Sequence, residues 1–385
     1  MAQEPTQKKP GLLELLDEWE KQGASDAEIT QRMNRYLDSK ARKEGVPIHG
    51  TFELTPLCNL DCKMCYVHLS EKQLRESGKR LLTVDEWKDI MQQAIDAGMM
   101  SAILTGGECL SYHGFDELYL FLSEQGIEVT VKTNGLLLTE ERIAFFRQHP
   151  PLDIVVTLYG ADEATYEKVT GRRLFAKAIA GIKRAIEADF YVVVCITPNR
   201  FMLENVEALF SLAESLGCPV KVNIALYDSR EETGRGGNDY DLTEEEYFRL
   251  YRLLAKMPNE VLPPSCAEDI PKPNQDGRPV IGLPCGGGRS SFAIHWDGVM
   301  HPCLMLDDIQ ADVKDSTFDI CWEKIGRGVR NHIFPGECLN CAYRPLCPVC
   351  VVQHGMSGSF EHANKKFCRR AVRLLQENLV QYKHD

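Results

Sequence analysis

Between residues 50 and about 225, short apolar runs alternate with longer amphipathic patterns, and this alternation constrains the fold more than any other feature. Six of the runs are rich in the β-branched and aromatic residues that favour strands. They read HGTFELT, SAILTGG, EVTVKTNG, DIVVTLYG, FYVVVCITPN and PVKVNIAL. Because a helical pattern or a connection follows each run, the order predicts a mostly parallel sheet with right-handed crossovers. We therefore expect an α/β fold built on a partial (β/α)6 TIM-like barrel.

Chemically distinctive residues stand directly after the first four runs. Cys58 begins a cysteine-rich loop after the first run, and Gly106 to Glu108 follow the second. Asn134 and Thr157 stand at the ends of the third and fourth. Ligands of parallel α/β sheets bind at the carboxyl ends of the strands. The sequence therefore predicts a single site at this edge of the sheet.

The composition is that of a soluble globular protein, with 44% hydrophobic and 26% charged residues in a chain of 385. No apolar run approaches the roughly 18 residues that span a bilayer. The N-terminal residues lack the apolar core of an export signal, which predicts a cytoplasmic protein. A net charge of −12 disfavours the basic surface that nucleic-acid binding needs. We therefore expect neither a membrane nor a nucleic acid among its partners.

The cysteines form the second informative pattern. Fifteen cysteines in a chain without an export signal favour metal or cluster ligands over disulfides. Three of them, Cys58, Cys62 and Cys65, lie in the loop CNLDCKMC. Structural zinc takes four ligands, commonly from paired CxxC turns. A cubane iron–sulfur cluster can instead be held by three thiolates while its fourth iron binds a group that is not protein, and three close cysteines suit that arrangement better.

The CxxxCxxC spacing and its place after the first strand resemble the hallmark of the radical S-adenosylmethionine (radical SAM) family. TGGECL, after the second strand, resembles the GGE motif of that family. The resemblance implies a [4Fe-4S] cluster on the three cysteines, with S-adenosylmethionine (AdoMet) bound to the open iron through its amino and carboxylate groups. Reduction of the cluster by one electron would then cleave AdoMet to a 5′-deoxyadenosyl radical, which abstracts hydrogen from a substrate.

The resemblance also assigns residues to AdoMet. Gly106 and Gly107 would let the backbone approach its methionine end. Glu108, or a carbonyl at the strand edge, would accept hydrogen bonds from its ammonium group. Asn134 and Thr157 stand where family members contact the ribose or carboxylate, although each is also an ordinary polar residue for a strand end.

Further candidates lie close to these motifs. Met64 occupies a position that is commonly aromatic and near the adenine, and Tyr66 follows the third cysteine. Cys109, directly after the GGE motif, is a candidate hydrogen-atom donor, with core packing as the alternative. For Arg172 and Arg173, pairing with a carboxylate competes with simple exposure to solvent.

A second group of cysteines lies between residues 285 and 370, where apolar patterning is sparse. Its spacing resembles the SPASM extension of radical SAM enzymes, except that two residues instead of three separate Cys347 from Cys350. The resemblance implies two auxiliary [4Fe-4S] clusters, and so three clusters in all. The outer cluster would be held by Cys338, Cys341, Cys347 and Cys368. The inner one would be held by Cys285, Cys303 and Cys350, with Cys266 or an open iron completing it. A zinc ribbon is the alternative, because CxxC pairs also bind zinc.

The same patterns divide the chain into five parts. We expect a helical extension over residues 1–48, the radical SAM core over 49–228, a linker with a helix over 229–284, a small irregular cluster-bearing domain over 285–370, and a C-terminal helix over 371–385. In the extension, Ser25 and Glu28 form the capping box of a second helix.

The resemblance leaves the substrate open. A ribosomally made peptide, to be crosslinked, joined through a thioether or epimerised, is the first hypothesis. A small-molecule precursor of a cofactor or tetrapyrrole is the second, and a non-catalytic iron–sulfur carrier is the third. Sulfatase-maturing relatives carry an Asp after the cysteine equivalent to Cys303, and Leu304 at that position argues against this group.

Two protein partners follow from these expectations. A flavodoxin- or ferredoxin-type donor would supply the electron. Only about 45 mostly helical residues precede the first strand. The N-terminal helices or a separate leader-binding protein would therefore recognise the leader of a peptide substrate.

Overall fold

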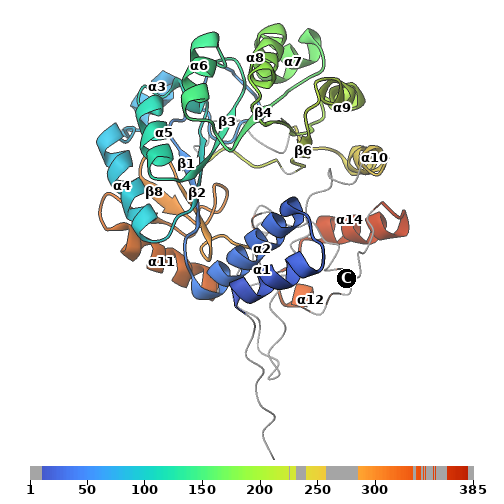
Figure 1. Cartoon of the computed structure of the whole chain (residues 1–385). Coiled ribbons are helices and arrows are strands. Elements are labelled where there is room, and N and C mark those ends of the chain that lie inside the picture. Colours follow the sequence, from blue (N-terminus) through green and yellow to red (C-terminus); the bar gives the residue numbers. More distant parts are fainter. Residues whose placement is uncertain are drawn as a thin grey trace, which may run out of the picture.

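A single sheet forms the centre of the protein. The computed structural model describes residues 11–224, 226–230, 240–256 and 285–332, together with 335–339, 341, 343, 350, 352 and 362–379. The sheet has the order β6-β5-β4-β3-β2-β1-β7-β8-β9, and helices surround it (Figure 1). Its strands are β1 (His49–Glu53), β2 (Ser101–Thr105), β3 (Glu128–Thr133), β4 (Asp153–Thr157), β5 (Val192–Ile196), β6 (Val220–Val222), β7 (Ser291–Ile294), β8 (Val299–His301) and β9 (Ala311–Asp312).

Strands β1 to β6 are parallel and lie side by side in chain order. The predicted α/β fold with a partial (β/α)6 barrel is therefore confirmed. Helices or helical turns connect the strands, as right-handed crossovers require. They are α3 (Glu71–Glu76) and α4 (Val84–Asp96) after β1, η1 (Cys109–Ser111) and α5 (Phe115–Glu124) after β2, α6 (Glu140–Gln148) after β3, α7 (Glu163–Thr170) and α8 (Phe175–Glu187) after β4, and η2 (Leu203–Asn205) and α9 (Val206–Ser215) after β5.

Helix α4 shows how the sequence specifies these crossovers. Thr83 and Glu86 form a capping box at its first turn, so two backbone donors that lack helical partners are satisfied. Its apolar side chains recur at helical spacing and form one buried stripe against the sheet. The buried residues are Trp87, Ile90, Met91 and Ala94.

The C-terminal cysteine region begins within the same sheet. β7 pairs in parallel with β1, and β8 and β9 continue the sheet as antiparallel strands. Phe292 on β7 packs edge-on against Phe52 on β1, with ring centroids 5.8 Å apart. The domain boundaries drawn from the sequence stay predictions, but the sheet crosses the one placed at 284.

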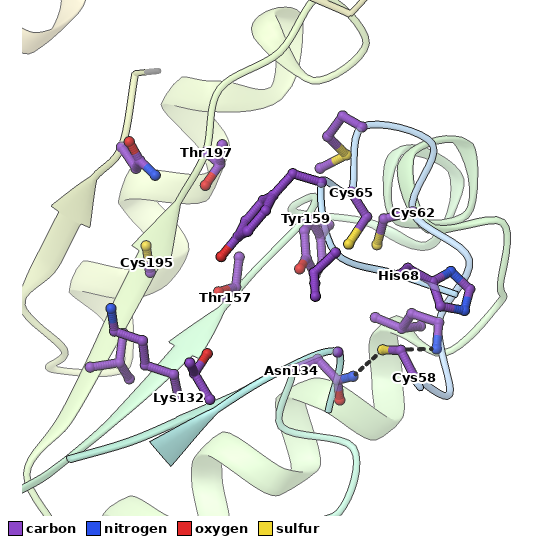
Figure 2. Close-up of a pocket in the computed structure, with 18 of the residues that line it drawn as sticks. Cys58, Cys62, Cys65, His68, Lys132, Asn134, Thr157, Tyr159, Cys195 and Thr197 are labelled. Carbon is purple, nitrogen blue, oxygen red and sulfur yellow. Dashed lines mark hydrogen bonds between the residues drawn. The ribbon is translucent and has the colours of Figure 1, made fainter. Parts of the chain in front are cut away.

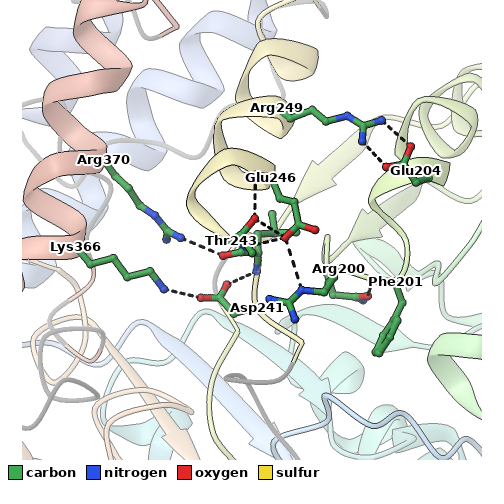
Figure 3. A network of polar contacts seen from close by, with 11 residues as sticks. Arg200, Phe201, Glu204, Asp241, Thr243, Glu246, Arg249, Lys366 and Arg370 are labelled. Atoms are coloured by element: carbon green, nitrogen blue, oxygen red, sulfur yellow. Dashed lines mark hydrogen bonds and ion pairs between the residues drawn. The ribbon is translucent and has the colours of Figure 1, made fainter.

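Helix α10 (Glu244–Leu254) joins the barrel to helix α14 (Lys365–Gln376) through a network of polar contacts (Figure 3). Toward α14, Lys366 donates to Asp241 at 3.0 Å, and Arg370 donates to the Leu242 carbonyl at 3.3 Å. Toward the barrel, Arg249 pairs with Glu204 at 2.8 Å. The helix of the predicted 229–284 linker is therefore a packed connection between two parts of the molecule.

The N-terminal helices pack against residues of the C-terminal region. Helices α1 (Leu12–Lys21) and α2 (Asp26–Glu44) form the N-terminal pair, and the predicted capping box at Ser25 and Glu28 is present. Ser290 donates to Asp38 of α2 at 2.9 Å. Trp322, on α11 (Phe318–Asn331), donates to the Gly45 carbonyl at 2.7 Å.

The remaining C-terminal helices are α12 (Gly336–Leu339) and α14. α14 begins at Lys365, ahead of the predicted residue 371, because the Asn364 side chain caps its first turn. Among the described residues, every helix is too short or too polar to span a bilayer.

Candidate active site

The loop after β1 carries the three cysteines and is pinned by backbone hydrogen bonds. Asp61 donates to the Thr170 carbonyl at 2.9 Å, and Leu69 donates to the Pro56 carbonyl at 3.1 Å. Cys58, Cys62 and Cys65 line a cavity of about 670 Å³ at the carboxyl edge of the strands, as Figure 2 shows. This volume is typical of small-molecule sites in proteins. The cavity therefore lies at the edge of the sheet where the sequence predicts the site.

The spacing of the three thiols distinguishes a cluster from a single ion. Four sulfurs around one zinc ion, each at about 2.3 Å, lie about 3.8 Å from one another. Among the described residues, the three loop sulfurs do not all lie within 4.8 Å of one another, so at least one pair is farther apart than in such a zinc site. The separate corners of an iron–sulfur cluster allow that arrangement.

Burial makes the thiolate forms of the loop cysteines costly without a cation. It raises the pKa of Cys58 to about 12 and the pKa of Cys62 well above its usual value, with the charges of the neighbouring cysteines adding to the rise. Two N–H groups already point at the Cys58 sulfur, from Leu60 at 3.4 Å and from the Asn134 side chain at 3.6 Å. Such donors accompany sulfurs that ligate a metal. The donor set therefore fits a cluster that binds thiolates.

The two glycines of the GGE motif hold the cysteine loop against β2. A Cβ on Gly107 would lie 2.3 Å from the Leu57 carbonyl oxygen, and one on Gly106 would lie 2.5 Å from that of Thr55. Gly106 also has φ +151°, which side chains disfavour. Gly107 donates to the Thr55 carbonyl at 2.7 Å. Both glycines line the cavity, and their small size also sets the position of the cysteines.

Glu108 lies beneath the cavity and is absent from its wall. Its side chain is fully buried, and it accepts hydrogen bonds from the Thr133 hydroxyl at 2.8 Å and from the Asn134 backbone at 2.9 Å. A third comes from the Leu110 backbone at 3.1 Å. Burial raises the pKa of this carboxyl, and the three donors oppose the rise. Glu108 thus fixes the ends of β2 and β3 relative to each other, which leaves the strand-edge carbonyl as the acceptor for an ammonium group.

The other AdoMet candidates are brought together around the cavity. Asn134, Thr157, Met64 and Tyr66 all line it. The Asn134 amide also donates to the Asn59 side chain at 2.7 Å, so it ties the end of β3 to the cysteine loop.

Three residues named from the sequence lie away from the cavity. Cys109 is fully buried and its thiol contacts the Lys132 carbonyl oxygen at 3.1 Å, a position that supports the core-packing alternative. Arg172 and Arg173 are exposed, and Arg173 pairs with Glu167 at 3.2 Å.

Sequence reasoning missed several residues of the cavity wall, among them His68, Lys132, Tyr159 and Cys195. In β3, Val129 and Val131 are buried, whereas the alternate residues Thr130 and Lys132 are less so. Polar residues at every second position of a buried strand are the signal that finds such a cavity. Tyr159 also hydrogen-bonds Cys62, which partly offsets the rise of that thiol's pKa.

The proposed inner auxiliary ligands lie close together. Burial, together with the charges of Cys350 and Cys285, raises the pKa of Cys303 to about 12. Tyr227 hydrogen-bonds Cys350 and also lines the cavity. The structure therefore places this cysteine group beside the cavity wall. Cys266, the predicted fourth ligand, lies outside the described residues.

The described members of the outer group occupy two segments that touch. Cys338 and Cys341 share one turn, in which the Cys341 amide donates to the Cys338 carbonyl at 3.4 Å. Cys368 lies in the first turn of α14. Glu337 accepts a hydrogen bond at 3.4 Å from the Ala363 backbone, shortly before that helix. Cys347 lies outside the described residues.

A buried ion pair joins the cysteine loop to the C-terminal strands. Arg230 donates to both carboxylate oxygens of Glu53, at 2.7 and 2.6 Å, and its guanidinium lies over the Tyr66 ring. Its Nη1 lies 2.6 Å from Nδ1 of His295. Because Nδ1 faces a donor, Nε2 of His295 carries the proton and is no metal ligand. The group formed by His295 and its neighbour His301 is therefore part of this network.

Comparisons with known proteins agree with this geometry. Residues 52–213 match the Radical SAM superfamily. The chain is 26% identical over 320 residues to the AdoMet-dependent heme synthase of Methanosarcina barkeri, an alignment that covers 78% of this chain and 89% of that protein. It is 25% identical over 279 residues to the sporulation killing factor maturation protein SkfB of Bacillus subtilis, covering 71% and 65% of the two chains.

Among solved structures, Streptococcus suis SuiB bound to S-adenosylmethionine shares the fold, with a TM-score of 0.65 and 18% identity over 90% of this chain and 83% of that one. SuiB also has a structure with its precursor peptide SuiA. The matched span 52–213 contains the cysteine loop, the GGE motif and those ends of β2 to β5 that line the cavity. The radical SAM family implies a [4Fe-4S] cluster and AdoMet as cofactors. The chain is an enzyme that carries a radical SAM domain over residues 52–213.

Proposed function

We propose that this enzyme modifies a ribosomally made peptide, by crosslinking, thioether formation or epimerisation. The observation that carries the proposal is that the three loop thiols line one cavity in the barrel. The resemblance to SkfB, a maturation protein, and to SuiB, seen with a precursor peptide, supports a peptide as the substrate.

Each part of the site has a proposed task. Cys58, Cys62 and Cys65 hold the cluster, and Gly106 and Gly107 leave room for the methionine end of AdoMet. When bound, the cluster and AdoMet supply an electron and a carbon radical that takes hydrogen from the substrate. Apolar residues form part of the cavity wall around that reaction and limit the access of water to it. They include Val155, Val222, Leu226 and Met305.

Two auxiliary [4Fe-4S] clusters complete the proposal. Cys285, Cys303 and Cys350 would hold the inner cluster beside the cavity, with Cys266 or an open iron as the fourth position. Cys338, Cys341, Cys347 and Cys368 would hold the outer one. A flavodoxin- or ferredoxin-type protein would donate electrons, and the cytoplasm, where thiols stay reduced, would be the compartment.

Leader recognition is assigned to helices α1 and α2 or to a separate protein. The two helices pack beside the C-terminal cysteine region, through Asp38 and Gly45. α1 contains no buried residue, so its amphipathic surface is available to a partner.

The second candidate is a carboxylated tetrapyrrole or another small cofactor precursor. The likeness to the heme synthase of Methanosarcina barkeri over 78% of the chain favours it.

Deuterium transfer separates the two candidates. Anaerobically reconstituted, reduced enzyme is incubated with AdoMet and either deuterated peptides encoded beside its gene or a deuterated carboxylated porphyrin. We expect deuterium from a peptide to appear in 5′-deoxyadenosine by mass spectrometry, together with loss of hydrogen mass from the peptide. Transfer from the porphyrin alone would replace the peptide proposal with the second candidate. Cys218→Ala, at a residue that does not line the cavity, serves as the control variant.

A further inference from the structure

The cavity beside the cysteine loop continues to a second group of polar side chains. Figure 2 shows Lys132 and Cys195 on the side of the hollow opposite Cys58. The wall around them is formed by strands β4 to β6 and the residues that follow these strands. Its polar members are Thr157, Thr197, Lys221 and Asn223. Neither Lys132 nor Lys221 has a task in the proposed function.

Lys132 and Lys221 bring two positive charges to one cavity from β3 and β6, which are not neighbours in the sheet. Burial lowers the pKa of the Lys132 ammonium group, and the charge of Lys221 lowers it further. Neither lysine forms an ion pair with any residue that the structure describes. Asp153 acts on Lys132 only weakly, and its carboxylate accepts a hydrogen bond from Thr130. Lys132 is half-buried and Lys221 is exposed at the cavity wall. A bound anion would be attracted by both charges, and it would offset the cost of burying the Lys132 ammonium group.

We propose that Lys132 and Lys221 bind a carboxylate of the substrate, at or beside the residue that loses hydrogen. The inference rests on the proposed function, because carboxylates are the anions of an unmodified peptide at neutral pH. The hydroxyls of Thr157 and Thr197 and the amide of Asn223 line the same part of the cavity and can donate to the carboxylate oxygens. Charge and donors together form a subsite that selects an acidic residue or a C-terminus.

The carboxylate of AdoMet is the competing occupant. It is expected at the open iron of the cluster, and the cysteines that would hold that cluster lie across the cavity from Lys132 (Figure 2). The two lysines are therefore available to a second molecule while AdoMet occupies the cysteine side.

Calorimetry on the AdoMet-loaded, unreduced holoenzyme tests the subsite. Three probes are used: acetylated, amidated tetrapeptides with Glu at one position, the same peptides with Gln there, and a carboxylated porphyrin. The variants are Lys132→Met, Lys132→Arg and Lys221→Met, with Lys183→Met as a matched control on the exposed face of α8. Iron content and melting temperature establish that each variant folds.

We expect the enzyme to bind the Glu peptides at least about tenfold more tightly than the Gln peptides. Lys132→Met and Lys221→Met should remove that preference, whereas Lys132→Arg and Lys183→Met should keep it. Lysine-dependent binding of the porphyrin alone would uphold the carboxylate subsite and overturn the peptide as substrate. Two results overturn the subsite itself: no probe whose affinity depends on either lysine, or a loss of AdoMet affinity in Lys132→Met, which would assign the lysine to AdoMet.

Discussion

The two cysteine-bearing regions of the molecule are organised differently. In the barrel, the loop of Cys58 is held by backbone hydrogen bonds that reach β2 and the end of α7. In the C-terminal region, the Cys338 amide donates to the Pro335 carbonyl and the Cys341 amide donates to the Cys338 carbonyl. A hydrogen bond from the Ala363 amide to the Glu337 side chain reaches the segment before α14. Cys341 is exposed, whereas Cys62 is buried.

This difference indicates which of the two sites keeps its shape without a bound cluster. A loop that is pinned by long-range bonds and close glycine contacts keeps its shape without a cluster. A segment with few buried apolar residues gains its order from metal ligation. We therefore expect the barrel site to be preorganised and the outer C-terminal site to fold around its metal.

The contact between the two regions is the place where the largest effect is expected. Arg230→Met leaves the fully buried Glu53 carboxylate without its partner and removes the contact with His295. Loss of one member of a buried ion pair costs about 3–5 kcal/mol of unfolding free energy. Anaerobic denaturant titration measures it. Arg80→Met, which breaks an exposed pair with Glu86, is the control and should cost less than about 1 kcal/mol. Equal losses of unfolding free energy in the two variants would show that the ion pair of Arg230 with Glu53 does not stabilise the contact between the two regions.

Preorganisation of the barrel site predicts a strong effect of one methyl group. In Gly107→Ala the new Cβ meets a backbone oxygen at 2.3 Å, so the cysteine loop must move. Displacement of a catalytic site by about 1 Å can cost about 100-fold in rate. We expect AdoMet cleavage to fall by about that factor while the auxiliary iron remains. Gly11→Ala, with nothing near its Cβ position, should behave as wild type. Unchanged activity in Gly107→Ala would show that the contact does not position the loop.

Removal of iron should affect the two regions unequally. After anaerobic chelation, amides of the segment around α12 should exchange at least about tenfold faster, because that segment loses its metal-derived stability. Amides of β2 and β3 should keep their protection. Hydrogen exchange with mass spectrometry follows both in one sample. Equal loss of protection in β3 would contradict the comparison.

The smallest effect concerns the electronics of the barrel cluster. Asn134→Ala removes the N–H group 3.6 Å from the Cys58 sulfur. A lost hydrogen bond of about 1 kcal/mol corresponds to about 40 mV for a one-electron couple. Because such donors stabilise the reduced cluster, the midpoint potential should become more negative. A redox titration followed by electron paramagnetic resonance measures the shift. Asn34→Ala, at an exposed position of α2, is the control, and a shift of equal size there would show that the effect does not come from the hydrogen bond to Cys58.

Local pattern was enough to predict the barrel and the edge where its site lies. Strand periodicity placed the cysteine loop, Gly106, Asn134 and Thr157 at one edge, and the structure brings all of them to the cavity. The role of Glu108 was beyond the sequence, because it depends on β2 and β3 pairing so that Thr133 becomes its partner.

Other features could not be predicted because they depend on contacts between residues far apart in the chain. β7 joins β1 although their residues are far apart in the chain, and no local signal specifies that register. Lys132 and Lys221 likewise line the same cavity because the sheet curves, and the periodicity of the sequence does not encode that curvature.

We propose above all that three cysteines after β1 hold a cluster whose open iron binds AdoMet. The direct measurement is 5′-deoxyadenosine release by anaerobically reconstituted, reduced enzyme, compared between wild type and the variant Cys58→Ala, Cys62→Ala, Cys65→Ala. The control variant is Cys218→Ala, Cys321→Ala. We expect wild type and control to release 5′-deoxyadenosine. The triple variant should release none, although it should retain its auxiliary iron. Release of 5′-deoxyadenosine by the triple variant would contradict this proposal.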